Sequence, residues 1–193
     1  MTDRRARWTL AALVAVFAAP VVAAWGLYHG LGWRGDGTAA AGRLVIPAVR
    51  LPETPVTGRD GATHQDVGAL WRRHWTMLQV APDGCRDACQ ASLRQSRQVR
   101  AVLHTDAARV QRMLILGDNT SPIARAAMQP DLAIYRTKVV DWRPTLAAHA
   151  ADAPGTILLI DPAGRWMASY PPPADADALH HDINRLLAQA GRP

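Results

Sequence analysis

Two cysteines, Cys85 and Cys89, constrain this 193-residue chain most, because they lie in one short turn between two kinds of predicted structure. Residues 75–80 before them are mostly apolar and end at a turn with proline and glycine, which predicts a short buried strand. From about residue 87 to residue 104, apolar side chains recur at helical spacing. The pair therefore lies at the carboxyl end of a strand and the amino end of a helix.

The rest of the chain continues this alternation. Further strands are predicted at 113–116, 132–135, 156–160 and 165–170, and helices after Ser121-Pro122, at 141–150 and at 174–189. Strands that alternate with helices imply an α/β protein with a mostly parallel sheet covered on both faces. A closing hairpin and a terminal helix make this order thioredoxin-like. In such a sheet, the functional site is expected beyond the carboxyl ends of the strands, and the cysteines lie at such an end.

An apolar run over residues 8–28 precedes this domain and contains no charged residue. About twenty such residues cross a bilayer as a helix. Arginines precede the run and do not recur until Arg34, which predicts a cytoplasmic N-terminus. We expect residues 1–7 in the cytoplasm, a single transmembrane anchor over 8–31 in a bacterial inner membrane, and a periplasmic C-terminal domain. Small residues at 22–24 leave a cleaved signal peptide as the alternative.

Residues 32–56 contain several glycines and prolines, which predict a periplasmic tether without structure of its own. The folded domain is then expected to cover residues 57–193, and the chain length suits one domain with a short appendage. The 22 Lys and Arg residues exceed the 16 Asp and Glu residues, but they are scattered along the chain. Without a basic cluster interleaved with aromatic residues, no nucleic-acid partner is predicted.

In the oxidising periplasm, a lone cysteine pair can be a structural disulfide, a redox pair or a metal site. The positive end of a helix dipole favours the thiolate form of a nearby cysteine. Arg86 favours it as well, whereas Asp83 and Asp87 oppose it. Two thiolates three residues apart can exchange with a disulfide or hold the soft ion Cu(I). The residues alone leave these alternatives open.

The layout resembles the Sco/SenC family of copper chaperones for cytochrome c oxidase assembly. The matching pieces are the Asp60-Gly61 turn, the entry into the strand at 71–80, Cys85-Arg86-Asp87-Ala88-Cys89 and the segment 158–165. The resemblance spans about residues 50–190. It implies a thioredoxin-like domain on a membrane anchor, with a role in oxidase assembly.

The chain lacks one of the copper ligands of that family. Sco proteins carry a histidine just before the late strand, and it completes the copper site with the two cysteines. That position falls here at about Ala153, and His149 is the nearest candidate. The chain more closely resembles small membrane-anchored Sco-like proteins encoded among proteobacterial oxidase assembly genes. Two thiolates without an imidazole suit Cu(I) but bind Cu(II) poorly. The missing histidine therefore favours thiol–disulfide exchange over a role as a copper chaperone. Pro154 lies roughly where thioredoxins place a cis-proline.

We therefore expect a protein that assists cytochrome c oxidase biogenesis, with oxidase subunits or other assembly factors as partners. Cys85 and Cys89 would act as a redox pair or as Cu(I) ligands, and His149 is the candidate third metal ligand. No cofactor other than Cu(I) is predicted. The alternative is a non-enzymatic assembly or scaffold protein whose disulfide is structural, so the sequence leaves open whether the protein is an enzyme.

Overall fold

The computed structural model describes residues 42–65, 67–120, 129–138 and 142–190, together with Trp8, Leu13 and residues 17–19. Residues 1–39 and 40–193 form two separate compact units. Among the described residues, no helix is long and apolar enough to cross a membrane. The anchor predicted over 8–31 lies almost entirely outside the described residues, as does the predicted helix after Ser121-Pro122, so both stay predictions.

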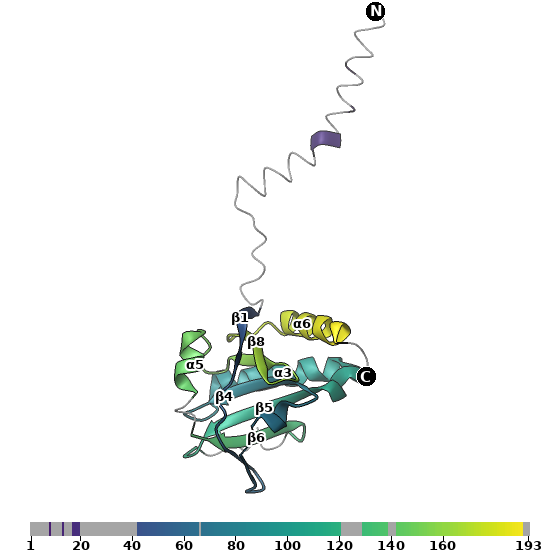
Figure 1. Ribbon diagram of the computed structural model, residues 1–193. Helices are drawn as coiled ribbons and strands as arrows, with labels where there is room; N and C mark the ends of the chain where they lie inside the picture. Colours follow the sequence, from purple (N-terminus) through teal and green to yellow (C-terminus); the bar gives the residue numbers. More distant parts are fainter. Residues whose placement is uncertain are drawn as a thin grey trace, which may run out of the picture. The chain divides into compact units, whose positions relative to one another are not determined.

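A mixed sheet forms the centre of the second unit (Figure 1). Its described strands follow the order β1-β8-β7-β4-β5-β6-β2-β3. Their bounds are β1 (Arg43–Arg50), β2 (Val56–Gly58), β3 (Thr63–His64), β4 (Trp75–Ala81), β5 (Val110–Gly117), β6 (Leu132–Thr137), β7 (Ile157–Ile160) and β8 (Arg165–Tyr170).

The prediction of a mostly parallel sheet is wrong. In the described part of the chain, only β4, β5 and β6 run parallel to one another, and every other neighbouring pair is antiparallel. For the pairs β2–β3 and β7–β8 the physical reason is connection length, because a parallel pair needs a crossover of a dozen or more residues and the turns that join these strands are too short for that.

Helices cover both faces of the sheet, as expected for an α/β domain (Figure 1). The described helices are α2 (Gly68–Trp71), α3 (Asp87–Val102), the 3₁₀ helix η1 (His104–Arg109), α5 (Arg143–Ala148) and α6 (Ala176–Gln189). On one face, α3 and α6 lie against each other, and Val99 and Leu179 share one apolar cluster. On the other face, Leu146 of α5 packs with Leu78 and Trp166. The helices predicted over 87–104, 141–150 and 174–189 are confirmed.

Residues predicted as tether belong to the sheet. Strand β1 pairs antiparallel with β8 as the outermost strand, and Val45 is 7% exposed in the core. The folded domain therefore begins before residue 57. Glycine and proline suggested a tether, but an edge strand tolerates proline because its outer N–H groups have no strand to pair with. The register of the β1–β8 pairing shifts between Leu44 and Val49, around Pro47.

A buried arginine ties α3 to the sheet. Arg112 of β5 is 1% exposed. Its guanidinium donates to Ser96 Oγ (3.1 Å), the Leu93 carbonyl oxygen (2.6 Å), Gln129 Oε1 (2.8 Å) and Asp131 Oδ2 (2.9 Å). Burial by itself would raise the pKa of Asp131. The hydrogen bond and positive charge of Arg112, with smaller contributions, outweigh burial, so that the pKa of this carboxyl lies below its usual value.

We expect Asp131→Asn to lower the free energy of unfolding by about 2–3 kcal/mol at pH 7, because it leaves Arg112 buried without its charged partner. A carboxyl with a lowered native pKa stabilises fully above its unfolded-state pKa of about 3.9 and loses that contribution as the pH falls through the native value. The difference between wild type and variant should therefore shrink below about pH 4. Urea unfolding at neutral and acid pH measures it.

Asp83→Asn is the matched control, because it removes an ion pair between exposed side chains. Arg143 lies 3.0 Å from Asp83, and their side chains are 53% and 79% exposed. Such a pair contributes at most about 1 kcal/mol. Equal losses in the two variants would contradict the role given to the buried pair.

Candidate functional site

Cys85 and Cys89 form a disulfide at the amino end of α3, with their Cα atoms 5.1 Å apart. Strand β4 ends at Ala81, and the Gly84 N–H donates to the Ala81 carbonyl oxygen at 3.2 Å. This turn reverses the chain directly into the helix. The predicted placement of the pair, between the end of a strand and the start of a helix, is confirmed.

The disulfide is shielded from solvent. Cys85 is 4% exposed and Cys89 is 2% exposed, whereas residues 86–88 between them are exposed. The two cysteines pack into an apolar cluster on the α3 side of the sheet, with Ala81, Leu93, Leu114, Leu116, Leu132 and Ile134. The surface over the disulfide is therefore formed by the backbone and side chains of residues 86–88, and the sulfur atoms lie beneath it.

Two segments pack against the loop that leads into the disulfide. At the end of β5, a Cβ added to Gly117 would overlap the carbonyl oxygen of Pro82. At the start of α5, Arg143 donates to Asp83 Oδ1 at 3.0 Å. The loop is held from both sides at the carboxyl ends of β4 and β5.

A third segment, the turn before β7, touches the backbone between the two cysteines. Gly155 has a φ of 92°, and a Cβ added there would lie 2.7 Å from the Ala88 carbonyl oxygen and 3.1 Å from the Cys89 nitrogen. The Thr156 N–H (3.0 Å) and Oγ1 (2.8 Å) both donate to the Ala153 carbonyl oxygen and close this turn. Glycine satisfies both requirements here, because it adopts positive φ and occupies little space.

The expectation of a cis-proline at Pro154 is wrong. The cis peptide bonds among the described residues are Ile46–Pro47 and Pro172–Pro173, so the Ala153–Pro154 bond is trans. The close approach to the cysteine turn is made instead by Gly155, through the absence of a side chain. The sequence contained this glycine, but nothing in its local pattern indicated the distant contact with α3.

His149 is not brought to the cysteines. Its Nδ1 donates to the Thr145 carbonyl oxygen at 2.9 Å, and its ring lies 5.0 Å from that of Trp166. Trp166 belongs to the apolar cluster on the face of the sheet opposite the disulfide. Among the described residues, no group of three or more His, Cys, Asp or Glu side chains is arranged to hold a metal ion. The prediction of His149 as a third metal ligand is therefore corrected, because the end of α5 packs on the face of the sheet opposite the disulfide.

Gln79 is a buried polar residue that the sequence analysis did not single out. It is 1% exposed, and neither its amide nitrogen nor its amide oxygen has a hydrogen-bond partner in the described part of the chain. Strand alternation places it on the same face as Ala81, which packs with both cysteines. A lone amide in the mostly apolar run of β4 was the signal in the sequence.

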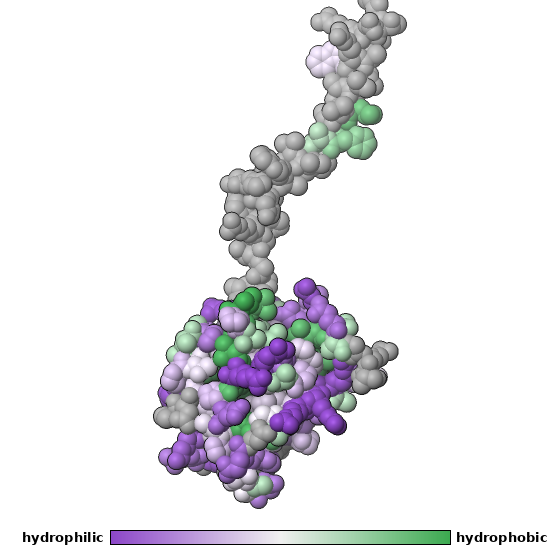
Figure 2. All heavy atoms as spheres, viewed as in Figure 1, coloured by the Kyte–Doolittle hydropathy of each residue, from purple (hydrophilic) through white to green (hydrophobic). Residues whose placement is uncertain are grey.

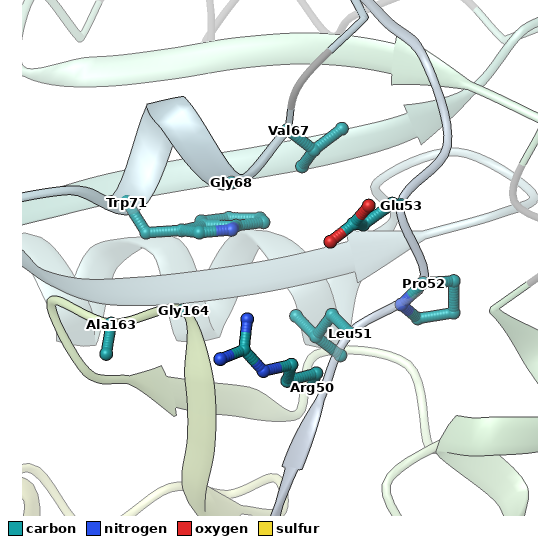
Figure 3. Close-up of a pocket in the computed structure, with 9 residues that line it drawn as sticks. All are labelled: Arg50, Leu51, Pro52, Glu53, Val67, Gly68, Trp71, Ala163 and Gly164. Carbon is teal, nitrogen blue, oxygen red and sulfur yellow. The ribbon is translucent and has the colours of Figure 1, made fainter.

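A small pocket elsewhere does not belong to this site (Figure 3). It has a volume of about 30 Å³ and is lined by Arg50, Glu53, Trp71 and Gly164, among others. Because β7 runs antiparallel to β4, the turn that contains Gly164 lies at the end of the sheet away from the disulfide. The volume suits about two water molecules rather than an organic ligand.

A disulfide between a central strand and the first long helix of a helix-covered mixed sheet defines a thioredoxin-like protein with a C-x-x-x-C pair. The sequence model of one family, described as the transmembrane-like, thioredoxin-like, C-terminal domain, matches residues 75–190. The chain belongs to this family.

Solved structures share the fold at low sequence identity. Copper-bound ScoI from Bradyrhizobium japonicum matches with a TM-score of 0.54 at 15% identity, over 72% of this chain and 100% of that chain. Apo Sco1 from Thermus thermophilus matches with a TM-score of 0.57 at 16% identity, over 79% and 100%. The thioredoxin domain of a thiol-disulfide oxidoreductase from Bacteroides vulgatus matches with a TM-score of 0.50 at 13% identity, over 72% and 95%. None of the curated proteins compared with the chain matches it. The fold is therefore Sco-like.

We expect Gly155→Ala to lower the free energy of unfolding by about 3 kcal/mol, because positive φ and overlap with the Ala88 backbone act together. Displacing this turn should also speed reduction of the disulfide by dithiothreitol. Urea unfolding and thiol trapping measure the two effects.

Gly61→Ala is the control for Gly155→Ala. Gly61 also has positive φ, at 81°, but nothing lies within 4 Å of an added Cβ. The Gly61→Ala variant should lower the free energy of unfolding by only about 1 kcal/mol and leave the rate of disulfide reduction unchanged. If the two variants behave alike, the contact with the cysteine turn has no energetic importance.

Replacing Gln79 by methionine should raise the free energy of unfolding by about 1 kcal/mol, since it removes two unpaired buried polar atoms at similar volume. Urea unfolding at pH 7 checks it. A loss of stability would mean that the amide is hydrogen-bonded in solution.

Proposed function

We propose that this chain is a membrane-anchored periplasmic protein that assists cytochrome c oxidase biogenesis by thiol–disulfide exchange at Cys85 and Cys89. The observation that carries the proposal is the disulfide at the amino end of α3, in a Sco-like thioredoxin fold. The uncharged run over 8–28 and the arginines before it support the anchor and its orientation. The resemblance to oxidase assembly proteins supports the partner.

In the exchange reaction, the reduced pair donates two electrons to a disulfide of the partner. The Cys85 thiolate attacks one partner sulfur, forms a mixed disulfide and expels the second partner sulfur as a thiolate. The Cys89 thiolate then attacks the Cys85 sulfur, re-forms the internal disulfide and releases the first partner sulfur. The partner is proposed to be the copper-receiving oxidase subunit, and a second thiol protein reduces the pair again.

Position favours Cys85 as the attacking residue. It precedes α3 in the turn, whereas Cys89 lies within the first turn of the helix and is the less exposed of the two. At 4% exposure, Cys85 is reached only after the surrounding turns move. The segments that have to move are those around Gly117 and Gly155, which pack directly on the cysteine loop.

The same reduced pair offers two thiolate ligands to Cu(I) as cargo, which is the second form of the proposal. Among the described residues, no His, Asp or Glu side chain lies with them as a third ligand. This donor set suits two-coordinate Cu(I) and not Cu(II).

Burial of both cysteines favours one further candidate, a non-enzymatic assembly protein with a structural disulfide. The reduction potential separates the candidates. The full chain in detergent is equilibrated with thiol redox buffers, and the fraction of free thiol is measured. A potential below about −300 mV marks a structural disulfide and rejects exchange. A Cys89→Ser variant, which cannot resolve a mixed disulfide, should trap the oxidase subunit in cells, and failure to trap it removes that partner.

Anaerobic titration of the reduced chain with Cu(I) tests the copper form. We expect stoichiometric binding that is lost in Cys85→Ser and in Cys89→Ser. His149→Ala is the matched control and should change the affinity by less than about twofold, because His149 packs against Trp166 on the opposite face. A large loss in His149→Ala would mean that α5 rearranges on reduction, and absence of binding in the wild type removes the copper form.

A further inference from the structure

An apolar groove with a volume of about 350 Å³ lies between α6 and the sheet edge formed by β1, β8 and β7. Its lining includes Leu44, Met167 and Leu186, and its polar members include Asp182 and Arg185. The groove is larger than the pocket beside Trp71 and is not part of the cysteine site. It is large enough to receive apolar groups from outside the domain.

Two exposed side chains on β1 extend the apolar surface of this groove. Leu44 is 72% exposed and Ile46 is 84% exposed, whereas Val45 between them faces the core. Strand alternation therefore places Leu44 and Ile46 on the groove side of the sheet. Among the large apolar side chains described in residues 42–190, only Val102, at 50%, is also exposed. Figure 2 shows apolar surface over β1, where the described domain begins.

Two arginines lie at the margin of this apolar surface. Arg185 is exposed in the lining of the groove, and Arg43 is exposed at the start of the edge strand, where strand alternation directs its Cβ to the face opposite Leu44 and its long side chain can reach past the strand edge. Asp182 is the acidic residue of the lining, and its carboxylate accepts a hydrogen bond from the Tyr170 hydroxyl at 2.7 Å. An apolar surface with cationic neighbours is complementary to anionic phospholipid, whose acyl chains and phosphates match the two parts.

The number of residues before β1 is small enough to keep this surface near a bilayer that holds the proposed anchor. About 14 residues separate the end of the apolar run at residue 28 from the start of β1, a chain length with a root-mean-square span of roughly 20 Å. The groove lies where the chain enters the domain, because Gly42 and Leu44 both line it.

We propose that Leu44, Ile46 and the groove beside α6, together called the β1 face, dock on the surface of an anionic phospholipid bilayer. Leu44 and Ile46 enter the acyl boundary, and Arg43 and Arg185 pair with lipid phosphates. The docking goes beyond thiol exchange and does not depend on the chemistry of the cysteines. It rests on the proposed anchor only for proximity.

Docking also orients the cysteine site. Arg43 pairs with Ser169, and Ser169 pairs with Leu158 near the start of β7. The turn before β7 touches the cysteine turn through Gly155. The first residues of β1 therefore lie toward the end of the sheet that carries the disulfide, so that docking holds the disulfide near a partner anchored in the same membrane.

The test uses the full chain in nanodiscs of phosphatidylcholine with or without phosphatidylglycerol, with a nitroxide on some headgroups and methyl-labelled Leu, Ile and Val. We expect the methyl signals of Leu44 and Ile46 to lose at least about half their intensity relative to Val102, and more so with phosphatidylglycerol. The double variant Arg43→Glu, Arg185→Glu and high salt should restore the intensity.

A second comparison separates docking from simple proximity. In Leu44→Ser, Ile46→Ser, the nitroxide should no longer broaden the Leu186 methyl signals, whereas Val102→Ser should leave that broadening unchanged. Equal broadening at residues 44, 46 and 102, or a chain that does not insert, overturns the proposal. Broadening that depends on protein concentration and not on the nitroxide identifies a second copy as the occupant and also overturns it. Because none of these signals depends on the thiols, failure here leaves thiol exchange standing.

Discussion

The burial of β4 on both of its faces is the constraint on which the rest of the structure depends. This strand lies between β5 and β7, with apolar clusters on both of its faces. A strand buried on both sides needs a nearly continuous apolar sequence, and its carboxyl end cannot shift without disturbing its neighbours. The cysteine turn follows directly from that end, so the rigidity of the sheet fixes where α3 begins and where the disulfide lies.

The disulfide combines an exposed backbone with buried sulfur. Residues 86–88 face solvent, while both cysteines face the apolar cluster beneath α3. The contacts of Pro82 with Gly117 and of Ala88 with Gly155 are contacts of backbone with backbone, which leave little room for side-chain adjustment. Access to sulfur is therefore coupled to movement of these turns. This coupling links the rate of disulfide reduction to the stability of the turn before β7, for an exchange site and for a structural disulfide alike.

Much of the fold follows from local patterns in the sequence. The apolar run of β4, the spacing of apolar residues in α3 and α6, and the Asp60-Gly61 turn all depend on a few neighbouring residues, and the structure confirms them. The relative directions of the strands and the existence of strand β1 could not be predicted from these local patterns. The pairing of β1 with β8, for example, joins residues that are more than a hundred positions apart in the sequence. Local composition indicated a tether there, since it carries no information on a distant partner strand.

The sequence by itself determined that a cysteine pair lies between a buried strand and a helix, and that two thiols are the chemistry available there. Only the tertiary structure decided which residues surround the pair. It placed His149 against Trp166 on the face of the sheet opposite the disulfide, and Gly155 against the backbone of Ala88. It also placed Gln79 on the same face as the disulfide, without a hydrogen-bond partner among the described residues. The physical reason is that residue type and spacing govern local conformation, whereas neighbours across a sheet depend on strand order and on the face to which each side chain points.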